Sequence, residues 1–143
     1  YGVRALVRDP ARGGDLAAAG VELFRGDIVN AADVARAAEG CTHIHHIAAL
    51  YRTAGHPDSY YHDVNVGGTE HVLAAAKAQG VARVVHCSTV GVHGHVSQVP
   101  SDEESPYNPG DIYQETKLEG EKRAQAAMQR GEPVSVVRPA GIY

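Results

Sequence analysis

The chain contains five short runs that are apolar or alternate between apolar and polar residues, and longer segments with helical spacing of their apolar positions separate them. Short runs bounded by Gly, Pro or Asp are typical of strands, whereas Ala-rich segments with a polar cap and a closing glycine are typical of helices. The predicted strands are residues 3–8, 21–25, 42–50, 83–89 and 133–137. The predicted helices are residues 11–19, 30–40, 59–79 and 111–130.

Strand and helix alternate throughout, and the connections are long enough for crossovers, so the strands are expected to be parallel. This order predicts one α/β domain over residues 1–143, with a doubly wound parallel sheet of Rossmann type. Ligands of such sheets bind at the carboxyl ends of the strands. Residues 26–27, 48–49, 88–89 and 139–141 all follow predicted strands and are expected on that rim.

The composition is that of an ordinary globular protein, with 43% hydrophobic and 21% charged residues among 143. The net charge of -4, without a basic block, argues against nucleic acid as a partner. No apolar run approaches the ~18 residues of a membrane span. Cys41 and Cys87 lack a C-x-x-C partner and have apolar neighbours, which predicts buried, reduced thiols in a cytoplasmic protein.

Nine histidines raise the question of a metal site. His43 and His45 share one face of the predicted strand 42–50, whereas His46 points to the other face. A zinc site needs three or four convergent ligands with polar support. We therefore expect no metal.

Tyr113 and Lys117 lie four residues apart in the predicted helix 111–130, so their side chains share one face, one turn apart. A phenol titrates near ~10, but a nearby ammonium favours the phenolate and lowers the pKa. A shift to ~7 requires roughly 4 kcal/mol of differential stabilisation. The pair is a candidate acid–base site; the alternative is an exposed amphipathic helix whose lysine lies along the surface.

Seven motifs, in order and spacing, make the chain resemble the extended short-chain dehydrogenase/reductase family, also called NAD-dependent epimerase/dehydratases. They cover nearly the whole chain. The motifs are Gly26-Asp27-Ile28, His46-Ile47-Ala48-Ala49, Asn65-Val66-Gly67-Gly68-Thr69, Gly80-Val81-Ala82-Arg83-Val84-Val85, Ser88-Thr89, Tyr113 with Lys117, and Arg138-Pro139.

The resemblance implies a set of cofactor-binding residues. Asp27, with Ile28 beside it, resembles the family's adenine contact, although a turn or helix N-terminal acid is the alternative. Ala48 and Ala49 are small where the backbone approaches the cofactor, and simple strand packing explains them equally. Asn65 resembles a residue that orders strands and water near the cofactor, and a plain polar contact on a helix remains the alternative.

The resemblance also implies the catalytic residues. Tyr113 is the expected acid/base, and Lys117 is expected to hold the nicotinamide ribose and to lower the pKa of Tyr113 together with an oxidised, cationic nicotinamide. Thr89 matches the hydroxyl that bonds the substrate oxygen, with Ser88 as the neighbouring alternative and an expected cofactor contact. The stretch Pro139–Ile142 resembles the segment that packs on the nicotinamide face.

Arg8 bears on the choice between NADP and NAD. NAD-preferring members usually carry an acid at the end of this strand, and Val7 stands at that position here. The run Val7-Arg8-Asp9-Pro10 resembles reductases of the dihydroflavonol type, whose arginine meets the 2′-phosphate. NADP is slightly favoured over NAD, and an ordinary exposed arginine is the alternative.

The chain departs from the family pattern in three places. The family's first strand with its G-x-x-G-x-x-G loop and its C-terminal substrate domain have no counterpart here, so we expect a partial NAD(P)-binding domain with an incomplete sheet. His93 stands where the family often has a tyrosine, in a position expected near the substrate.

These features predict an NAD(P)-dependent oxidoreductase or epimerase/dehydratase that acts on a nucleotide sugar or a small ketone. The alternative is a non-catalytic dinucleotide sensor, although such proteins commonly lose the Tyr or the Lys. A homodimer formed through the predicted helices 59–79 and 111–130 is possible on the same resemblance.

Overall fold

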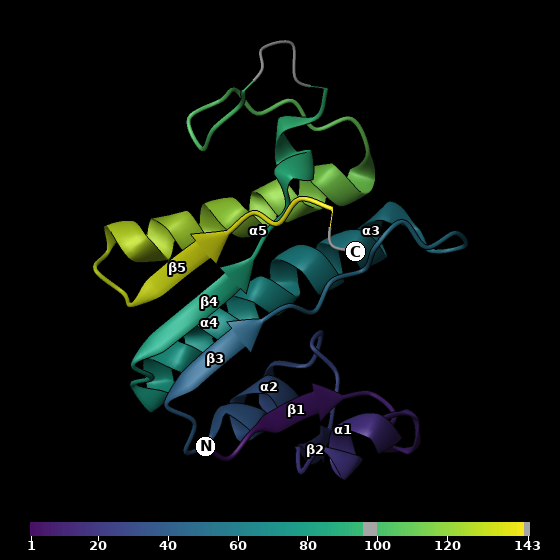
Figure 1. Cartoon of the computed structure of the whole chain (residues 1–143), viewed down its shortest axis with the longest axis vertical. Helices are drawn as coiled ribbons and strands as arrows, with labels where there is room; N and C mark the ends of the chain where they lie inside the picture. The colour runs from purple at the N-terminus through teal and green to yellow at the C-terminus, as the bar shows by residue number, and fades with distance from the viewer. Residues whose placement is uncertain (96–99, 142–143) are drawn as a thin grey trace.

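The computed structural model describes residues 1–95 and 100–141, and within these ranges strands and helices alternate along the chain (Figure 1). Every strand pair is parallel, as the long crossover connections predict. The α/β class with parallel strands is therefore confirmed. The strands are β1 (Arg4–Val7), β2 (Glu22–Arg25), β3 (His43–His46), β4 (Arg83–Cys87) and β5 (Val134–Val137).

The strands form two sheets rather than one, because within residues 1–95 and 100–141 no strand joins β1 to β3. One sheet has the order β1-β2 and the other the order β3-β4-β5. Residues of β1 and of β3 line the two sides of one groove of about 1330 Å³. This separation agrees with the expectation of an incomplete sheet that lacks its central strand.

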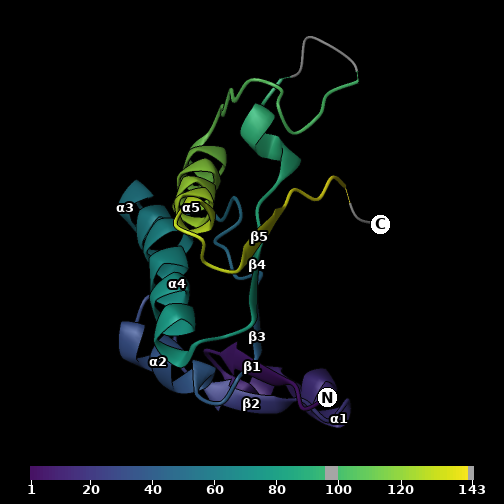
Figure 2. The same cartoon turned by 90° about the vertical axis from the view of Figure 1, so that its left-hand side faces the viewer.

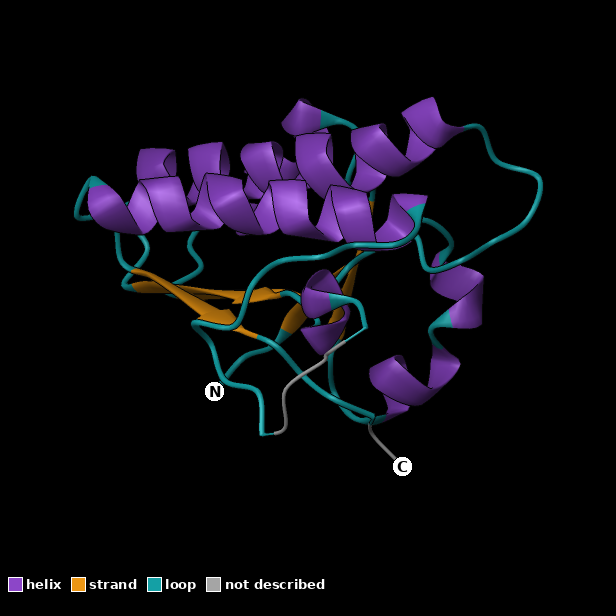
Figure 3. Ribbon diagram, turned by 90° about the horizontal axis from the view of Figure 1, so that it is seen from above, coloured by secondary structure: helices purple, strands orange, loops and turns teal. Residues whose placement is uncertain are grey.

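The helices lie on one face of the larger sheet and on both faces of the smaller one (Figure 2). Helices α4 and α5 form a layer over β3, β4 and β5, while α1 lies on the opposite side of β1 and β2 from α2 (Figures 2 and 3). The helices and turns are η1 (Pro10–Arg12), α1 (Gly14–Ala18), α2 (Ala31–Ala38), α3 (Asp58–His62), the π-helical turn η2 (Asp63–Gly67), α4 (Gly68–Gln79), η3 (Val90–His93) and α5 (Ile112–Gln129).

Three predicted elements differ from those observed. The predicted helix 11–19 is a short 3-10 turn followed by one five-residue helix, because Gly13, at the junction, has a non-helical backbone conformation. The predicted strand 42–50 ends at His46, since the backbone of Leu50 bonds the Asn65 side chain instead of a neighbouring strand. The predicted strand 83–89 likewise ends at Cys87.

Local signals fix the ends of the helices that matter most. Asp111 caps α5, because its carboxylate accepts a hydrogen bond of 2.8 Å from the Gln114 backbone N–H. Gly80 ends α4 in the left-handed conformation, with a φ of 61°. Gly120 lets α5 approach η2 closely, since a Cβ at this position would lie 2.6 Å from the Asn65 carbonyl oxygen.

The core lies between α4, α5 and the larger sheet. Its buried apolar residues come from both helices and from β4 and β5, and they include Val72, Ala76, Val84, Ala124 and Val134. Both cysteines are free thiols and are only partly buried, which differs from the full burial expected from their apolar neighbours. None of the helices within the described ranges is long and apolar enough to span a bilayer.

Candidate active site

Tyr113 lies in the first turn of α5 and is half-buried. Burial raises its pKa above the ordinary value, and Tyr51 and Cys87 act in the same direction. A side-chain hydrogen bond with Thr89 and the charge of Arg52 lower the pKa. The net effect is a raised pKa, so the chain by itself keeps this phenol protonated at neutral pH.

Thr89 follows the end of β4 and meets Tyr113 there. Its Oγ1 accepts a hydrogen bond of 3.1 Å from the backbone N–H of Gly91. Its own hydroxyl hydrogen thus stays free to donate to another oxygen. The neighbouring Ser88 turns the other way and donates to Glu121 at 2.5 Å. Of the two hydroxyls left open by the sequence, the structure brings Thr89 to Tyr113.

Lys117 lies one turn after Tyr113 and is buried, with 4% of its surface exposed. Its Nζ donates a hydrogen bond of 2.6 Å to the Cys87 carbonyl oxygen at the end of β4. Burial lowers the pKa of Lys117 below its ordinary value, and Cys87 and Glu121 offset only part of this shift. The expected influence of Lys117 on the pKa of Tyr113 stays a prediction.

The groove between the two sheets collects five of the predicted cofactor-binding residues from the carboxyl ends of three different strands. The sequence places them far apart, and the fold brings them to one rim. They are Arg8, Asp27, Ile28, Ala48 and Ala49.

The side chains of the two charged residues of this set, Arg8 and Asp27, each make one long or local hydrogen bond. The exposed Arg8 reaches the Tyr60 hydroxyl at 3.4 Å. Asp27 Oδ1 accepts a hydrogen bond of 3.2 Å from the Val29 backbone N–H, which is the local turn contact considered as its alternative role. Ala48 and Ala49 are exposed, so strand packing does not account for their small size.

The remaining predicted cofactor residues lie elsewhere. Asn65 is buried, and its amide bonds the backbone of Leu50 and the hydroxyl of Thr116, so it fastens the segment after β3 to the helices. Pro139 follows β5 and accepts a hydrogen bond of 3.2 Å from the Val90 backbone N–H. Ile142 lies outside the described residues.

The sequence did not single out Tyr51 and Arg52, which lie against Tyr113. The Tyr51 ring meets the Tyr113 ring edge-on, with 4.9 Å between centroids. The Arg52 guanidinium lies 5.9 Å from the Tyr113 centroid and pairs with Asp111 at 2.7 Å. Both residues lie in a loop without periodicity, so no local pattern indicates their position.

The sequence also missed Glu121, which is fully buried one turn after Lys117 on the same helix. Its carboxylate accepts hydrogen bonds from Ser88, Arg138, Tyr107 and Gln125. The four-residue spacing from Lys117 was a signal that could have found it.

His93 belongs to the same cluster. Its buried ring stacks on Tyr107 with 5.5 Å between centroids, and its Nε2 lies 3.3 Å from Arg138 Nη1. The histidine is therefore held inside the cluster, and its expected position near the substrate stays a prediction.

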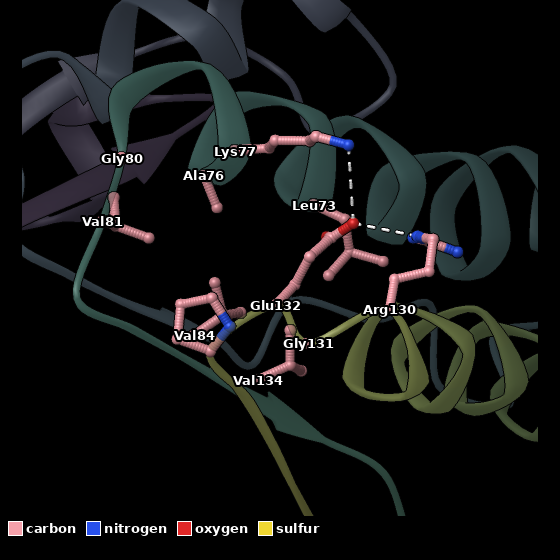
Figure 4. A pocket seen from close by; sticks show the side chains of 11 residues that line it. Leu73, Ala76, Lys77, Gly80, Val81, Val84, Arg130, Gly131, Glu132 and Val134 are labelled. Atoms are coloured by element: carbon pink, nitrogen blue, oxygen red, sulfur yellow. Dashed lines mark hydrogen bonds and ion pairs between the residues drawn. The ribbon is translucent and has the colours of Figure 1, made fainter.

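A second pocket, of about 490 Å³, lies at the opposite end of β4 and β5 from Tyr113 (Figure 4). At its rim Glu132 pairs with Arg130 at 2.9 Å and with Lys77 at 3.7 Å. Val84 and Val134, which lie in the amino-terminal halves of their strands, line it together with apolar residues of α4. This pocket lies away from the hydroxyls of Thr89 and Tyr113, so the candidate active site is at the carboxyl ends of the strands.

The parallel strands, the crossover helices and the polar residues at the strand ends define an α/β protein of Rossmann type. Residues 1–143 match the NAD dependent epimerase/dehydratase family. The chain therefore belongs to this family of extended short-chain dehydrogenase/reductases.

Similar proteins include both reductases and sugar-nucleotide enzymes. Sterol demethylase protein B of Methylococcus capsulatus is 34% identical and covers 98% of this chain, and a putative dihydroflavonol 4-reductase of Synechocystis is 31% identical over the same share. The structure resembles dTDP-glucose 4,6-dehydratase from Streptomyces venezuelae with NAD bound, with a TM-score of 0.85, 30% identity and 96% of this chain covered. The chain spans 44%, 42% and 45% of these proteins, respectively.

Proposed function

We propose that the chain carries the nucleotide-binding and acid–base residues of an NAD(P)-dependent oxidoreductase or epimerase/dehydratase. The observation that carries this proposal is the meeting of Tyr113 and Thr89 at the end of β4, on the same rim as the groove that holds the predicted cofactor residues. Acid–base chemistry needs a titratable group and a hydrogen-bond donor at one substrate oxygen.

In this proposal Tyr113 gives a proton to the substrate oxygen, or removes one, according to the direction of the reaction. Thr89 donates a hydrogen bond to the same oxygen and holds it beside the phenol. Lys117, whose Nζ donates to the Cys87 carbonyl, would hold a ribose hydroxyl and add its charge to the site.

The groove fits a dinucleotide in its chemistry. Exposed Ala48 and Ala49 allow a close approach to the backbone, the Asp27 carboxylate can accept from an exocyclic amine, and the exposed Arg8 can meet a phosphate. A nicotinamide cofactor supplies or accepts the hydride at the carbinol or ketone carbon. Arg8 favours NADP over NAD.

The substrate is proposed to be a small ketone or alcohol, with a nucleotide sugar as the alternative. The relative named as a putative dihydroflavonol 4-reductase and the Arg8 position support the ketone, whereas the dTDP-glucose 4,6-dehydratase likeness supports the sugar. A homodimer through the α4 and α5 region is part of the same proposal, and we expect no nucleic-acid or membrane partner.

The test is an assay of nucleotide consumption. NADPH and NADH are each incubated with the protein and either a panel of small ketones or UDP- and dTDP-sugars, and the loss of absorbance and the sugar products are measured. NADPH consumption with a ketone would support the reductase, and sugar conversion without net consumption the epimerase/dehydratase. Nucleotide binding without turnover of any of these compounds would favour the sensor and contradict the proposal.

A further inference from the structure

The buried carboxylate of Glu121 connects three segments that surround the candidate active site. Its Oε2 accepts a hydrogen bond of 2.5 Å from Ser88 Oγ, at the end of β4. Its Oε1 lies 2.5 Å from Arg138 Nη2, at the end of β5. The Tyr107 hydroxyl, from the segment before α5, donates to the same oxygen at 3.2 Å.

Arg138 extends this cluster to the turn that follows Thr89. Its Nη1 donates to the Glu103 carbonyl oxygen at 2.9 Å and contacts His93 at the end of η3. Thr89 therefore lies between two tethered residues, Ser88 directly before it and His93 four positions after it. The cluster thus contacts the chain on both sides of Thr89.

Glu121 is ionised in this setting despite its burial. Burial by itself raises its pKa, but the hydrogen bonds from Arg138 and Ser88 and the charge of Arg138 outweigh it and lower the pKa below the ordinary value. None of the residue is exposed, so the carboxylate cannot contact a substrate itself. Any influence on the chemistry must pass through the residues that it holds.

We propose that Glu121 is a positioning residue for the reaction: it ties the ends of β4 and β5 to α5 and so keeps the Thr89 hydroxyl beside the Tyr113 phenol. The inference rests on the roles proposed above for Tyr113 and Thr89. It assigns to Glu121 a function in the geometry of the site in addition to its place in the packing.

The sign of a titration shift separates positioning from simple electrostatics. Removal of a negative charge near Tyr113 would favour the phenolate and lower the pKa of Tyr113. Loss of the Thr89 hydrogen bond, which lowers that pKa in the wild type, would raise it. The positioning role therefore predicts an upward shift in Glu121→Gln, against the direction of the lost charge.

Ser88→Ala is the decisive second variant, because it removes one tether and leaves the charge of Glu121 in place. That charge also raises the pKa of Lys117, an influence that Ser88→Ala does not alter. If Glu121→Gln fails to fold, Ser88→Ala still tests the proposal. We expect an upward shift of about 0.5 to 1 pH unit in Tyr113, as for the loss of one hydrogen bond to the phenolate.

The experiment uses protein labelled with 3-fluorotyrosine, whose more acidic phenol titrates under milder conditions, and follows the pH dependence by fluorine NMR. Tyr113→Phe assigns the resonance among the seven tyrosines. The nuclear Overhauser effect between the Thr89 methyl and the Tyr113 ring at neutral pH is a second readout, which needs no titration. It should weaken in both variants.

Glu119→Gln is the matched control, because it makes the same change two residues earlier on the surface of α5, where Glu119 pairs with Arg123. An unchanged Tyr113 titration and an unchanged Overhauser effect in Ser88→Ala would overturn the positioning role, even if the melting temperature fell. Neither readout needs substrate or cofactor. Full turnover by Tyr113→Phe would instead overturn the proposed function, whatever the titration shows.

Discussion

At the scale of single residues, the chemistry depends on how the surroundings of Tyr113 set its proton affinity. Burial raises the pKa, and Thr89 and Arg52 act against it. A phenol with a raised pKa is protonated at neutral pH, so it is present as a proton donor and not as a base, although the higher pKa makes it a weaker acid. The cofactor-bound state must therefore contribute further positive charge if Tyr113 is to act as a base.

Arg52→Gln tests the contribution of the Arg52 guanidinium, whose charge lowers the pKa of Tyr113. We expect the pKa to rise, and the limb of the pH–rate profile that reports Tyr113 to move to higher pH. Because the Arg52 side chain is 50% exposed, solvent screens its charge, and the shift should stay below about one unit. Arg123→Gln, an exposed arginine further along α5, is the control, and an equal shift in both variants would contradict a local effect.

His46 and His86 make the fold sensitive to acid. Burial lowers the pKa of His46 to about 3 and that of His86 to about 4. Lys117 lowers both pKa values further, His86 also lowers that of His46, and Glu121 partly offsets the shift of His86. Neither nitrogen of His86 has a hydrogen-bond partner among the described residues. Both rings are therefore neutral in the folded state at pH values where an unfolded histidine is protonated.

The unfolded chain takes up these protons near pH 6.5, so stability is unaffected by them above this value and falls as the pH drops toward 4. At pH 5 the loss is roughly 2 kcal/mol for each histidine. Urea unfolding at pH 7 and at pH 5 measures it. His86→Met should reduce the difference between the two pH values, the exposed His45→Gln should not, and equal behaviour of the two variants would refute the assignment.

At the scale of elements, α5 is the part of the molecule that carries most of the site. Tyr113, Lys117 and Glu121 follow one another at four-residue intervals on this helix, and Gly120 permits its close contact with η2. The Asp111 cap and Gly120 thus help to position these three side chains.

Gly120→Ala is expected to destabilise the protein although alanine favours helices. The added Cβ would lie 2.6 Å from a backbone oxygen of Asn65, which cannot move aside as a side-chain tip can. Overpacking of this kind costs about 1–3 kcal/mol, more than the gain of up to ~1 kcal/mol in helix propensity. Thermal unfolding measures the difference, and Gly67→Ala, whose nearest contact is 3.9 Å away, is the control that should not lose stability.

The sequence predicted the elements whose ends have local signals. Asn30, Asp111 and Gly80 mark helix ends that the structure confirms within one or two residues. After β3 the chain is held at Leu50 by Asn65, a partner fifteen positions further on, so the pattern of residues 42–50 could not reveal where the strand ends. A strand ends where the adjacent segment stops offering hydrogen bonds, and which segment is adjacent depends on the whole fold.

The same distinction holds for the site. Tyr113, Thr89 and the groove residues could be predicted from the sequence because they belong to motifs on one helix and at strand ends. Glu121 and Arg52 were missed because their roles depend on tertiary contacts with Arg138 and Asp111. The split into two sheets is the same kind of long-range property.

At the scale of the whole molecule, the buried Glu121–Arg138 pair joins α5 to β5. Removal of one partner leaves the other charge buried and alone, which costs about 3–5 kcal/mol, whereas removal of both can be nearly neutral. We therefore expect Arg138→Met to lose that amount in urea unfolding, and Glu121→Met/Arg138→Met to lose less than the sum of the single variants. Additive losses would show that the two charges do not depend on each other.

In the proposed reaction, Tyr113 and Thr89 at the end of β4 perform acid–base chemistry while a hydride passes between a nicotinamide and a carbinol or ketone carbon. The most direct measurement follows deuterium from the C4 position of labelled NADPH into the alcohol formed from a ketone, with wild-type protein and with Tyr113→Phe. Deuterium transfer by the wild type, reduced about a hundredfold or more in Tyr113→Phe while NADPH still binds, is the predicted result. Undiminished transfer by Tyr113→Phe would contradict the account.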